Sequence, residues 1–97
     1  MIIRVFVAKT RPGANAKYER MIREQAMPLM QSYLGLMALH TGKSLENGGN
    51  EFVMVSIWRD LASLKAFTGD NWQQSVVLPG ETELVEYVVV NNYEAMG

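Results

Sequence analysis

Cysteine is absent from this chain of 97 residues, and histidine occurs only once. Without cysteine the protein can form no disulfide, offer no thiolate nucleophile and bind no metal through a cysteine sulfur. This composition suits a reducing compartment, and the cytoplasm is the location we expect. A single histidine among scattered carboxylates does not make a metal cluster, so no metal site is predicted.

An excess of charge of one sign is also missing. The nine Lys and Arg residues nearly balance the ten Asp and Glu residues, and no basic cluster offers a face for phosphates. This balance argues against a nucleic-acid partner. No apolar run approaches the roughly 18 residues that a membrane helix needs, and Arg4 interrupts the apolar N-terminus too early for a signal peptide. We therefore expect no membrane association.

The sequence does contain enough apolar side chain for one folded core. Hydrophobic residues make up 48% of the chain and charged residues 20%, which is typical of a globular protein rather than a disordered one. We expect a single domain covering residues 1–97, because no linker or low-complexity segment divides the chain.

Alternating apolar residues predict four strands, over residues 2–9, 35–43, 51–58 and 83–91, the last with a short tail through Tyr93. Between the second and third strands, the sequence Glu-Asn-Gly-Gly-Asn predicts a hairpin turn, because Asn-Gly steps favour the backbone of tight turns.

Helical spacing of apolar residues predicts two helices between these strands. The first begins at Asn15 as its N-cap, and Pro28 either kinks it or restarts it as a last turn. The second begins after Asp60 as its N-cap, and a further short helical turn is expected over residues 72–77. The apolar positions are Tyr18, Met21, Ile22, Ala26, Leu29, Met30 and Tyr33 in the first helix and Leu61, Leu64 and Phe67 in the second.

This order of elements predicts an α+β fold of the ferredoxin-like βαββαβ plan, with a four-stranded antiparallel sheet. Two helices cover only one face of such a sheet, yet three of the strands are apolar on both faces. A soluble monomer would expose that apolar face. The sequence therefore predicts a homodimer in which two sheets pack face to face and close an α/β barrel.

The third strand and the helix after it carry the clearest candidate pocket. Trp58 ends the strand, where a large amphipathic ring reaches the rim of a core, and it either lines a ligand pocket or packs in that core. Trp72 follows a helix breaker and is either a wall of the pocket or a surface-packing aromatic. The other side chains expected in the pocket are Phe52, Met54 and Phe67.

His40 is the only imidazole, the side chain best suited to proton transfer near neutral pH. Its position depends on the hairpin that follows it. A two-residue loop, which is the favoured geometry, sets His40 opposite Ile57, whereas a three-residue loop sets it opposite Ser56 on the face of Trp58. One residue of register thus decides whether His40 reaches the pocket.

Arg4 is placed among apolar neighbours on the first strand, where a charge needs either a protein partner or an anionic ligand. A salt bridge to Glu86 on the fourth strand is the plainer of these two alternatives.

A set of short motifs runs through nearly the whole chain: Pro12-Gly13 before the first helix, Pro28 late in it, Gly35-Leu36 opening the second strand, Phe52–Trp58 followed by Leu61–Phe67, and a fourth strand ending in Tyr93. Together they resemble the antibiotic biosynthesis monooxygenase family of dimeric α/β barrels. The resemblance implies the ferredoxin-like fold, the homodimer and a small hydrophobic or aromatic ligand.

Members of that family include cofactor-independent oxygenases of quinols and polycyclic phenols, and haem-degrading monooxygenases. In the first group the deprotonated substrate itself reduces dioxygen, so the protein supplies a dry pocket, a base and oxyanion stabilisers. Trp58 matches the family's tryptophan after the third strand. Quinol- and haem-oxidising members carry a histidine in the following helix; this chain has none there, which argues against haem ligation.

The resemblance therefore implies a cofactor-independent monooxygenase of a small aromatic or quinol-like compound. In this hypothesis Trp58 forms the wall, His40 is the base, and Arg4 or Tyr87 stabilises the oxyanion. The alternative is a non-catalytic dimer on the same scaffold that binds a small ligand or serves in stress.

Overall fold

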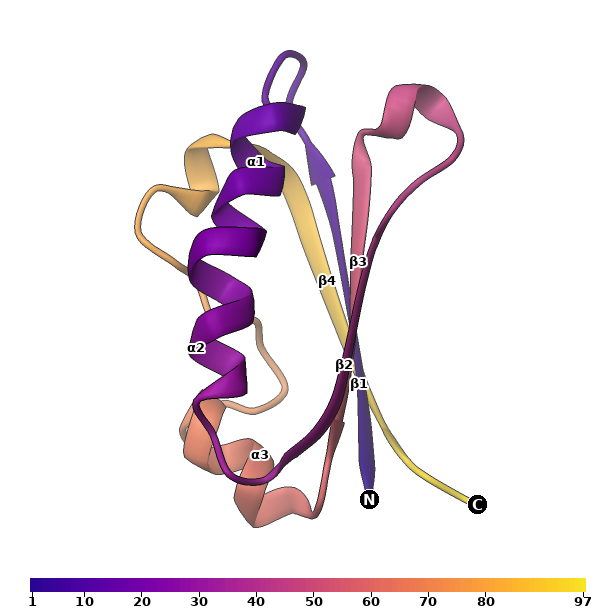
Figure 1. Ribbon diagram of the computed structural model, residues 1–97, viewed down its shortest axis with the longest axis vertical. Helices are drawn as coiled ribbons and strands as arrows, with labels where there is room; N and C mark the ends of the chain where they lie inside the picture. The colour runs from indigo at the N-terminus through magenta and orange to yellow at the C-terminus, as the bar shows by residue number, and fades with distance from the viewer.

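Four strands form one antiparallel sheet, which is the frame of the protein (Figure 1). They are β1 (Ile2–Thr10), β2 (Leu36–Lys43), β3 (Glu51–Trp58) and β4 (Val85–Glu94), in the order β2-β3-β1-β4. The computed structural model describes all 97 residues except for the side chain of residue 47. Because β1 lies between β3 and β4, its side chains have neighbours on both sides.

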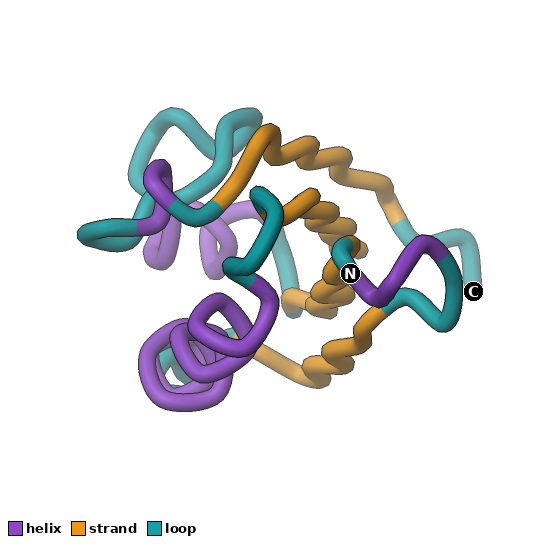
Figure 2. The backbone as a smooth tube through the Cα atoms, turned by 90° about the horizontal axis from the view of Figure 1, so that it is seen from above, coloured by secondary structure: helices purple, strands orange, loops and turns teal.

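Helices cover one face of this sheet (Figure 1 and Figure 2). α1 (Asn15–Met21), the π-helical turn η1 (Ile22–Ala26) and α2 (Met27–Gln31) follow one another as a single rod, and α3 (Leu61–Thr68) lies near the end of α2. Within the described residues, no helix is long and apolar enough to cross a membrane. The element order and the antiparallel pairing confirm the predicted ferredoxin-like α+β fold.

Pro28 explains why the rod has three parts. Proline cannot donate a backbone hydrogen bond, and its ring clashes with the carbonyl group four residues before it. The chain widens into η1 just before the proline and restarts as α2, with Pro28 in the first turn, where no N–H donor is needed. Of the two predicted outcomes, the restart as a last turn is confirmed.

The two predicted helix caps differ in outcome. The carboxylate of Asp60 accepts a hydrogen bond from the backbone N–H of Ser63 at 2.8 Å, which confirms it as the N-cap of α3. The prediction for Asn15 is wrong, because Ala14 is the N-cap of α1. The side chain of Asn15 accepts a hydrogen bond from the hydroxyl of Thr10 instead, so it ties α1 to the end of β1.

The prediction of a helical turn over residues 72–77 is also wrong. These residues belong to an irregular loop, residues 69–80, that leads from α3 to the 3-10 turn η3 (Glu81–Glu83). The backbone carbonyls of Trp72 and Gln74 accept hydrogen bonds from the guanidinium of Arg4. A side chain of the sheet therefore satisfies two carbonyls of the loop, in addition to the bond from the N–H of Gln74 to the carbonyl of Asn71.

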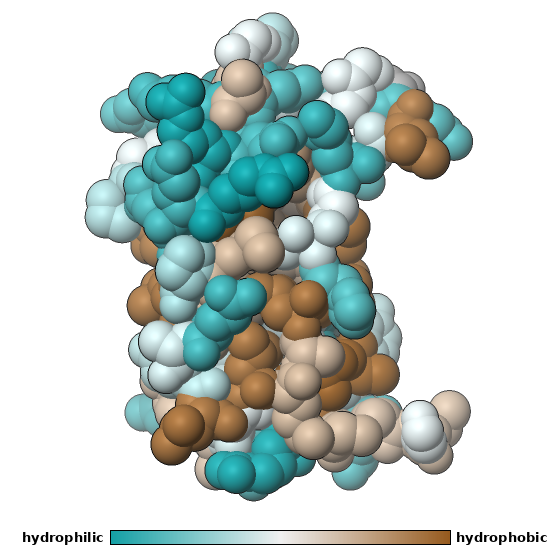
Figure 3. Space-filling model, in the orientation of Figure 1, coloured by the Kyte–Doolittle hydropathy of each residue, from teal (hydrophilic) through white to brown (hydrophobic). Residues whose placement is uncertain are grey.

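The sheet has an inner face under the helices and an outer face without any covering element. Side chains of β1 and β3 alternate between the two, buried on the inner face and partly exposed on the outer face. From the side, hydrophilic side chains gather over α1, and apolar ones lie over the lower half of the molecule (Figure 3). The apolar residues of the outer face are Ile3, Val5, Val7, Val53, Val55, Ile57, Tyr87, Val89 and Tyr93.

The hairpin between β2 and β3 is longer than either predicted loop. Lys43 pairs with Phe52, so His40 lies opposite Val55 rather than opposite Ile57 or Ser56. Both predicted registers are therefore wrong, because neither gives His40 its observed partner. Because Val55 and Ile57 share a face, His40 still lies on the outer face, as the favoured two-residue loop would have placed it.

Gly35, just before β2, allows α3 to pack closely against the chain. A Cβ atom at this position would lie 2.2 Å from Cβ of Ser63 and 2.3 Å from its Oγ. The carbonyl of Gly35 also accepts a hydrogen bond from the backbone N–H of Arg59 at 2.9 Å, which joins the two segments. Any side chain here would separate β2 from α3.

We predict that Gly35→Ala lowers the free energy of unfolding by about 1–3 kcal/mol, because the new methyl group overlaps the side chain of Ser63. Urea unfolding measures the change. In a double-mutant cycle, Ser63→Gly should recover part of the loss, because it removes the atoms that clash. Simple additivity of the two substitutions would contradict this explanation.

Candidate functional site

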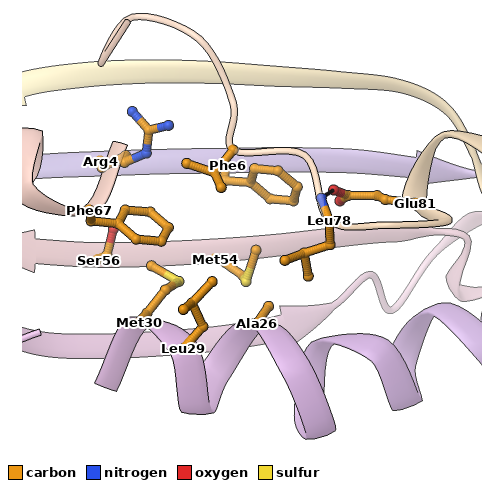
Figure 4. Close-up of a pocket in the computed structure, with 11 residues that line it drawn as sticks. Arg4, Phe6, Ala26, Leu29, Met30, Met54, Ser56, Phe67, Leu78 and Glu81 are labelled. Carbon is orange, nitrogen blue, oxygen red and sulfur yellow. Dashed lines mark hydrogen bonds between the residues drawn. The ribbon is translucent and has the colours of Figure 1, made fainter. Parts of the chain in front are cut away.

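A cavity lies between the inner face of the sheet, the helical rod and the loop 69–80 (Figure 4). The enclosed cavity is small, about 40 Å³, and the figure rises to about 470 Å³ when the gaps between its lining atoms and its open mouth are counted. Most of its wall is apolar, and the two charged residues come from β1 and η3. The lining residues are Arg4, Phe6, Ala26, Leu29, Met30, Met54, Ser56, Phe67, Val76, Leu78 and Glu81.

Arg4 is only 3% exposed, although its guanidinium is charged. Nη1 donates to the carbonyl of Trp72 at 2.6 Å and to Oδ1 of Asn92 at 3.0 Å, and Nη2 donates to the carbonyl of Gln74 at 2.8 Å. Burial lowers the pKa of Arg4, yet an arginine stays protonated at neutral pH. Its positive charge at this end of the cavity is thus balanced by neutral dipoles.

The predicted alternative for Arg4, a salt bridge to Glu86, is wrong. The register of β1 and β4 places Asn92 opposite Arg4, and Glu86 pairs with Lys9 at 3.7 Å. No carboxylate in the described part of the chain forms an ion pair with Arg4. A buried cation without a counter-ion suits an anionic or electron-rich ligand.

Glu81 provides the second charged group, from the turn between the loop and β4. It is 5% exposed, and its two carboxylate oxygens are held from different sides. Oε2 accepts a hydrogen bond from the hydroxyl of Tyr18 at 2.7 Å, and Oε1 accepts one from the backbone N–H of Leu78 at 3.1 Å. Burial, and then the hydrogen bond to Glu81 and its charge, raise the pKa of Tyr18, so this phenol stays protonated and donates.

Trp58 lies behind the cavity wall and is fully buried. Its ring stacks on Phe67, with centroids 5.3 Å apart and planes at 12°, and Tyr33 meets both rings edge-on. The indole N–H donates to Oγ of Ser56 at 3.0 Å. Phe67 and Ser56 line the cavity, so Trp58 fixes their positions without lining it.

The structure brings together three of the side chains predicted for the pocket, namely Arg4, Met54 and Phe67. Phe52 packs against Tyr18 toward the other end of the core, with ring centroids 5.3 Å apart. Trp72 takes part through its backbone carbonyl, which Arg4 binds. The side chains of Phe52 and Trp72 therefore do not line the cavity, contrary to the prediction.

His40 and Tyr87 lie away from this cavity. His40 is exposed opposite Val55, and Tyr87 is 44% exposed opposite Lys9, both on the outer face of the sheet. Within one protomer the sheet itself separates them from Arg4, so a histidine cannot act as a base or as a haem ligand in the cavity.

Sequence reasoning missed the other eight lining residues, among them Phe6, Ser56 and Glu81. The sequence could have indicated Phe6 and Ser56, because residues two apart in a strand point to the same face. Phe6 is two residues after Arg4, and Ser56 is two residues before Trp58. Glu81 has no local signal, because a glutamate after Pro-Gly looks like any surface turn. Within the described residues, no group of three or more His, Cys, Asp or Glu side chains could hold a metal ion.

Comparison with known proteins identifies similar sequences and folds. The model of a family described as "Antibiotic biosynthesis monooxygenase" matches residues 1–76. The protein PA3566 of Pseudomonas aeruginosa is 17% identical with a TM-score of 0.78, covering 99% of this chain and 94% of that one. Rv0793 of Mycobacterium tuberculosis is also 17% identical, with a TM-score of 0.77 and coverages of 99% and 95%.

A candidate antibiotic biosynthesis monooxygenase of Deinococcus radiodurans is 18% identical, with a TM-score of 0.76, covering 100% of this chain and 94% of that one. At these identities the likeness establishes a shared fold. Among curated proteins, no significant match to the sequence is found.

We predict that Arg4→Met loosens the loop 69–80 and lowers the free energy of unfolding by about 1.5–3 kcal/mol, because buried carbonyls lose their charged donor. Amide hydrogen exchange should accelerate in this loop before it does so in β3. The exposed Arg20→Met is the matched control. Equal exchange of the loop in both variants would contradict the role of Arg4.

Proposed function

Because the chain belongs to the antibiotic biosynthesis monooxygenase family, matched over residues 1–76 of 97, we propose that it is a cofactor-independent monooxygenase. Its substrate is a small aromatic compound of the phenol or quinol type, bound in the cavity between sheet and helices. The observation that carries this proposal is the buried guanidinium of Arg4 at one end of a cavity whose wall is mostly apolar.

The wall of the cavity supports an aromatic ligand. Phe6 and Phe67 present rings, and Met30 and Met54 present polarisable thioethers that pack well against aromatic faces. Such a wall excludes water from the reacting atoms, which strengthens every electrostatic interaction inside.

Arg4 supports the binding of an oxyanion. The hydrogen bonds to Trp72, Asn92 and Gln74 use three of the five guanidinium N–H groups. The two remaining N–H groups have no hydrogen-bond partner in the described part of the chain, and we propose that a phenolate oxygen accepts from one of them. Because the guanidinium is already oriented, it stabilises the anion without reorganising.

The phenolate supplies all the electrons of the reaction. Dioxygen accepts an electron and forms a C–O bond at the ring carbon opposite the phenolate oxygen. That carbon then loses its proton, the O–O bond breaks, and the second oxygen atom leaves with two protons as water. A phenol and dioxygen thus give a quinone and water, with atoms and electrons balanced.

The apolar outer face supports assembly as a homodimer. Tyr87, Val89 and Tyr93 on β4 are 44%, 47% and 53% exposed, and the valines and isoleucines of β1 and β3 continue the same surface. Two copies that pack through this face would bury it and leave the helices and the cavities outside.

We predict oxygen uptake above the buffer rate when wild-type protein meets a panel of phenols, quinols and anthrone in an oxygen electrode. Leu78→Trp should abolish it, because Leu78 points into the cavity and a larger ring would fill that space. Leu61→Trp, on the exposed side of α3, is the matched control and should keep the wild-type rate.

Two outcomes would contradict the proposed reaction. Equal uptake in Leu78→Trp and wild type would place the chemistry outside the cavity. No uptake by wild type with any member of the panel, together with saturable binding of the same compounds, would favour the non-catalytic ligand-binding dimer.

For the dimer, sedimentation equilibrium at micromolar concentration should give twice the chain mass. Val55→Asp should yield the monomer, because it places a charge in the centre of the apolar outer face. Gln25→Asp, which adds the same charge on the exposed side of the helical rod, should leave the dimer intact. A monomeric wild type would rule out this assembly.

A further inference from the structure

We propose that Glu81 is the general base of the cavity and that it selects ligands with an acidic proton on the side of a ring opposite a carbonyl or hydroxyl oxygen. The assignment rests on the proposed function and deepens it, since it names the group that starts the reaction and the ligand class that fits. It follows from the burial, the hydrogen bonds and the position of Glu81 relative to Arg4.

Glu81 is the only carboxylate among the residues that line the cavity. It is 5% exposed and forms no ion pair with a Lys, Arg or His in the described part of the chain. Keeping a carboxylate in such a place costs free energy unless hydrogen bonds compensate, and unpaired buried carboxylates gather at functional sites.

The hydrogen bonds of Glu81 orient it for proton transfer. Tyr18 on α1 and the N–H of Leu78 each donate a hydrogen bond to one oxygen, so the carboxylate is held in one orientation. Each oxygen keeps a second lone pair, so the carboxylate can still accept a proton. A fixed base at the cavity wall meets the geometric requirement for general base catalysis.

Glu81 and Arg4 lie at opposite ends of the cavity, with the ring of Phe6 between them (Figure 4). One end therefore accepts a proton, and the other stabilises negative charge on an oxygen. A single ligand can use both ends if its π system connects the two positions. Anthrone-type ketones have this arrangement, because the acidic CH2 group and the carbonyl lie across one ring.

The proposed step is a proton transfer that balances by itself. The C–H bond nearest Glu81 breaks, its proton moves to a carboxylate oxygen, and the electron pair stays on the ligand. Conjugation carries the negative charge to the oxygen beside Arg4, where the guanidinium stabilises it. The resulting electron-rich anion is the species that the proposed oxygenation requires.

Other titratable groups do not compete for this role. His40 is on the outer face, and Glu83, in the same turn as Glu81, is exposed and outside the lining of the cavity. The groups that face Glu81 from packed elements are the phenol of Tyr18 and, across the cavity, the guanidinium of Arg4.

The test is deuterium exchange of anthrone at its acidic CH2 group, followed by proton NMR in D2O under anaerobic conditions. Wild-type protein should accelerate the exchange over buffer, and Glu81→Gln should lower the protein-dependent rate by about 10²–10⁴-fold. A glutamine side chain has the same shape as glutamate. Its oxygen can accept the hydrogen bond from the N–H of Leu78 and its NH2 group can donate one to the hydroxyl of Tyr18, so the variant should fold. Glu83→Gln removes the same charge from the same turn and should leave the rate unchanged.

The anaerobic assay needs no dioxygen, so it separates this proposal from the proposed function. If deuterium exchange depends on Glu81 but no oxygen is taken up, Glu81 is supported as the general base and the proposed monooxygenase activity is contradicted. Oxygen uptake by wild type with equal exchange in Glu81→Gln would overturn the base and keep the monooxygenase. Wild-type exchange at the buffer rate would also overturn the assignment.

Tyr18→Phe provides a second test that does not remove the carboxylate. Loss of the phenol's hydrogen bond leaves one of the two carboxylate oxygens without the group that orients it, so the protein-dependent exchange rate should fall while the affinity for anthrone stays unchanged. An unchanged exchange rate in Tyr18→Phe would contradict the role of Tyr18 in orienting Glu81.

Discussion

The buried guanidinium of Arg4 is the constraint on which the site depends. It belongs to the central strand β1, and it binds the carbonyls of Trp72 and Gln74, which lie about 70 positions later in the chain. These bonds hold the loop 69–80 over the inner face of the sheet, where Leu78 completes the cavity wall. The same charge that closes the cavity also gives it a positive end, because the partners that orient it are neutral.

The buried polar side chains next to the cavity are hydrogen-bonded to one another. The indole of Trp58 uses Ser56, and the phenol of Tyr18 uses Glu81, so no buried side-chain nitrogen or oxygen in the described residues lacks a partner. Unsatisfied groups would attract water into an apolar space. The aromatic stack of Trp58 on Phe67 adds a rigid wall, and the polar functions are confined to the two ends of the cavity.

The two faces of the sheet differ in what they carry: the cavity lies on the inner face, and the surface proposed for the dimer contact lies on the outer face. The helical rod and α3 cover the inner face and create the cavity, whereas the outer face carries apolar side chains with no covering element in the protomer (Figure 1). Strand alternation alone assigns Val55 and Met54 to opposite faces, so this division was readable from the sequence. Which face carries His40 depended on hairpin length, a property that Gly-rich turns specify weakly.

Local physics in the sequence determined the strands, both helices, the restart at Pro28, the cap at Asp60 and the ferredoxin-like order, because each depends on residues close together in the chain. Tertiary structure decided the site. It chose Asn92 rather than Glu86 as the neighbour of Arg4, moved Trp58 behind the wall and carried Glu81 into the cavity beside Tyr18. The hydrogen bonds of Tyr18 with Glu81 and of Arg4 with Asn92 join residues 63 and 88 positions apart, and packing and strand register set these partners rather than any local pattern.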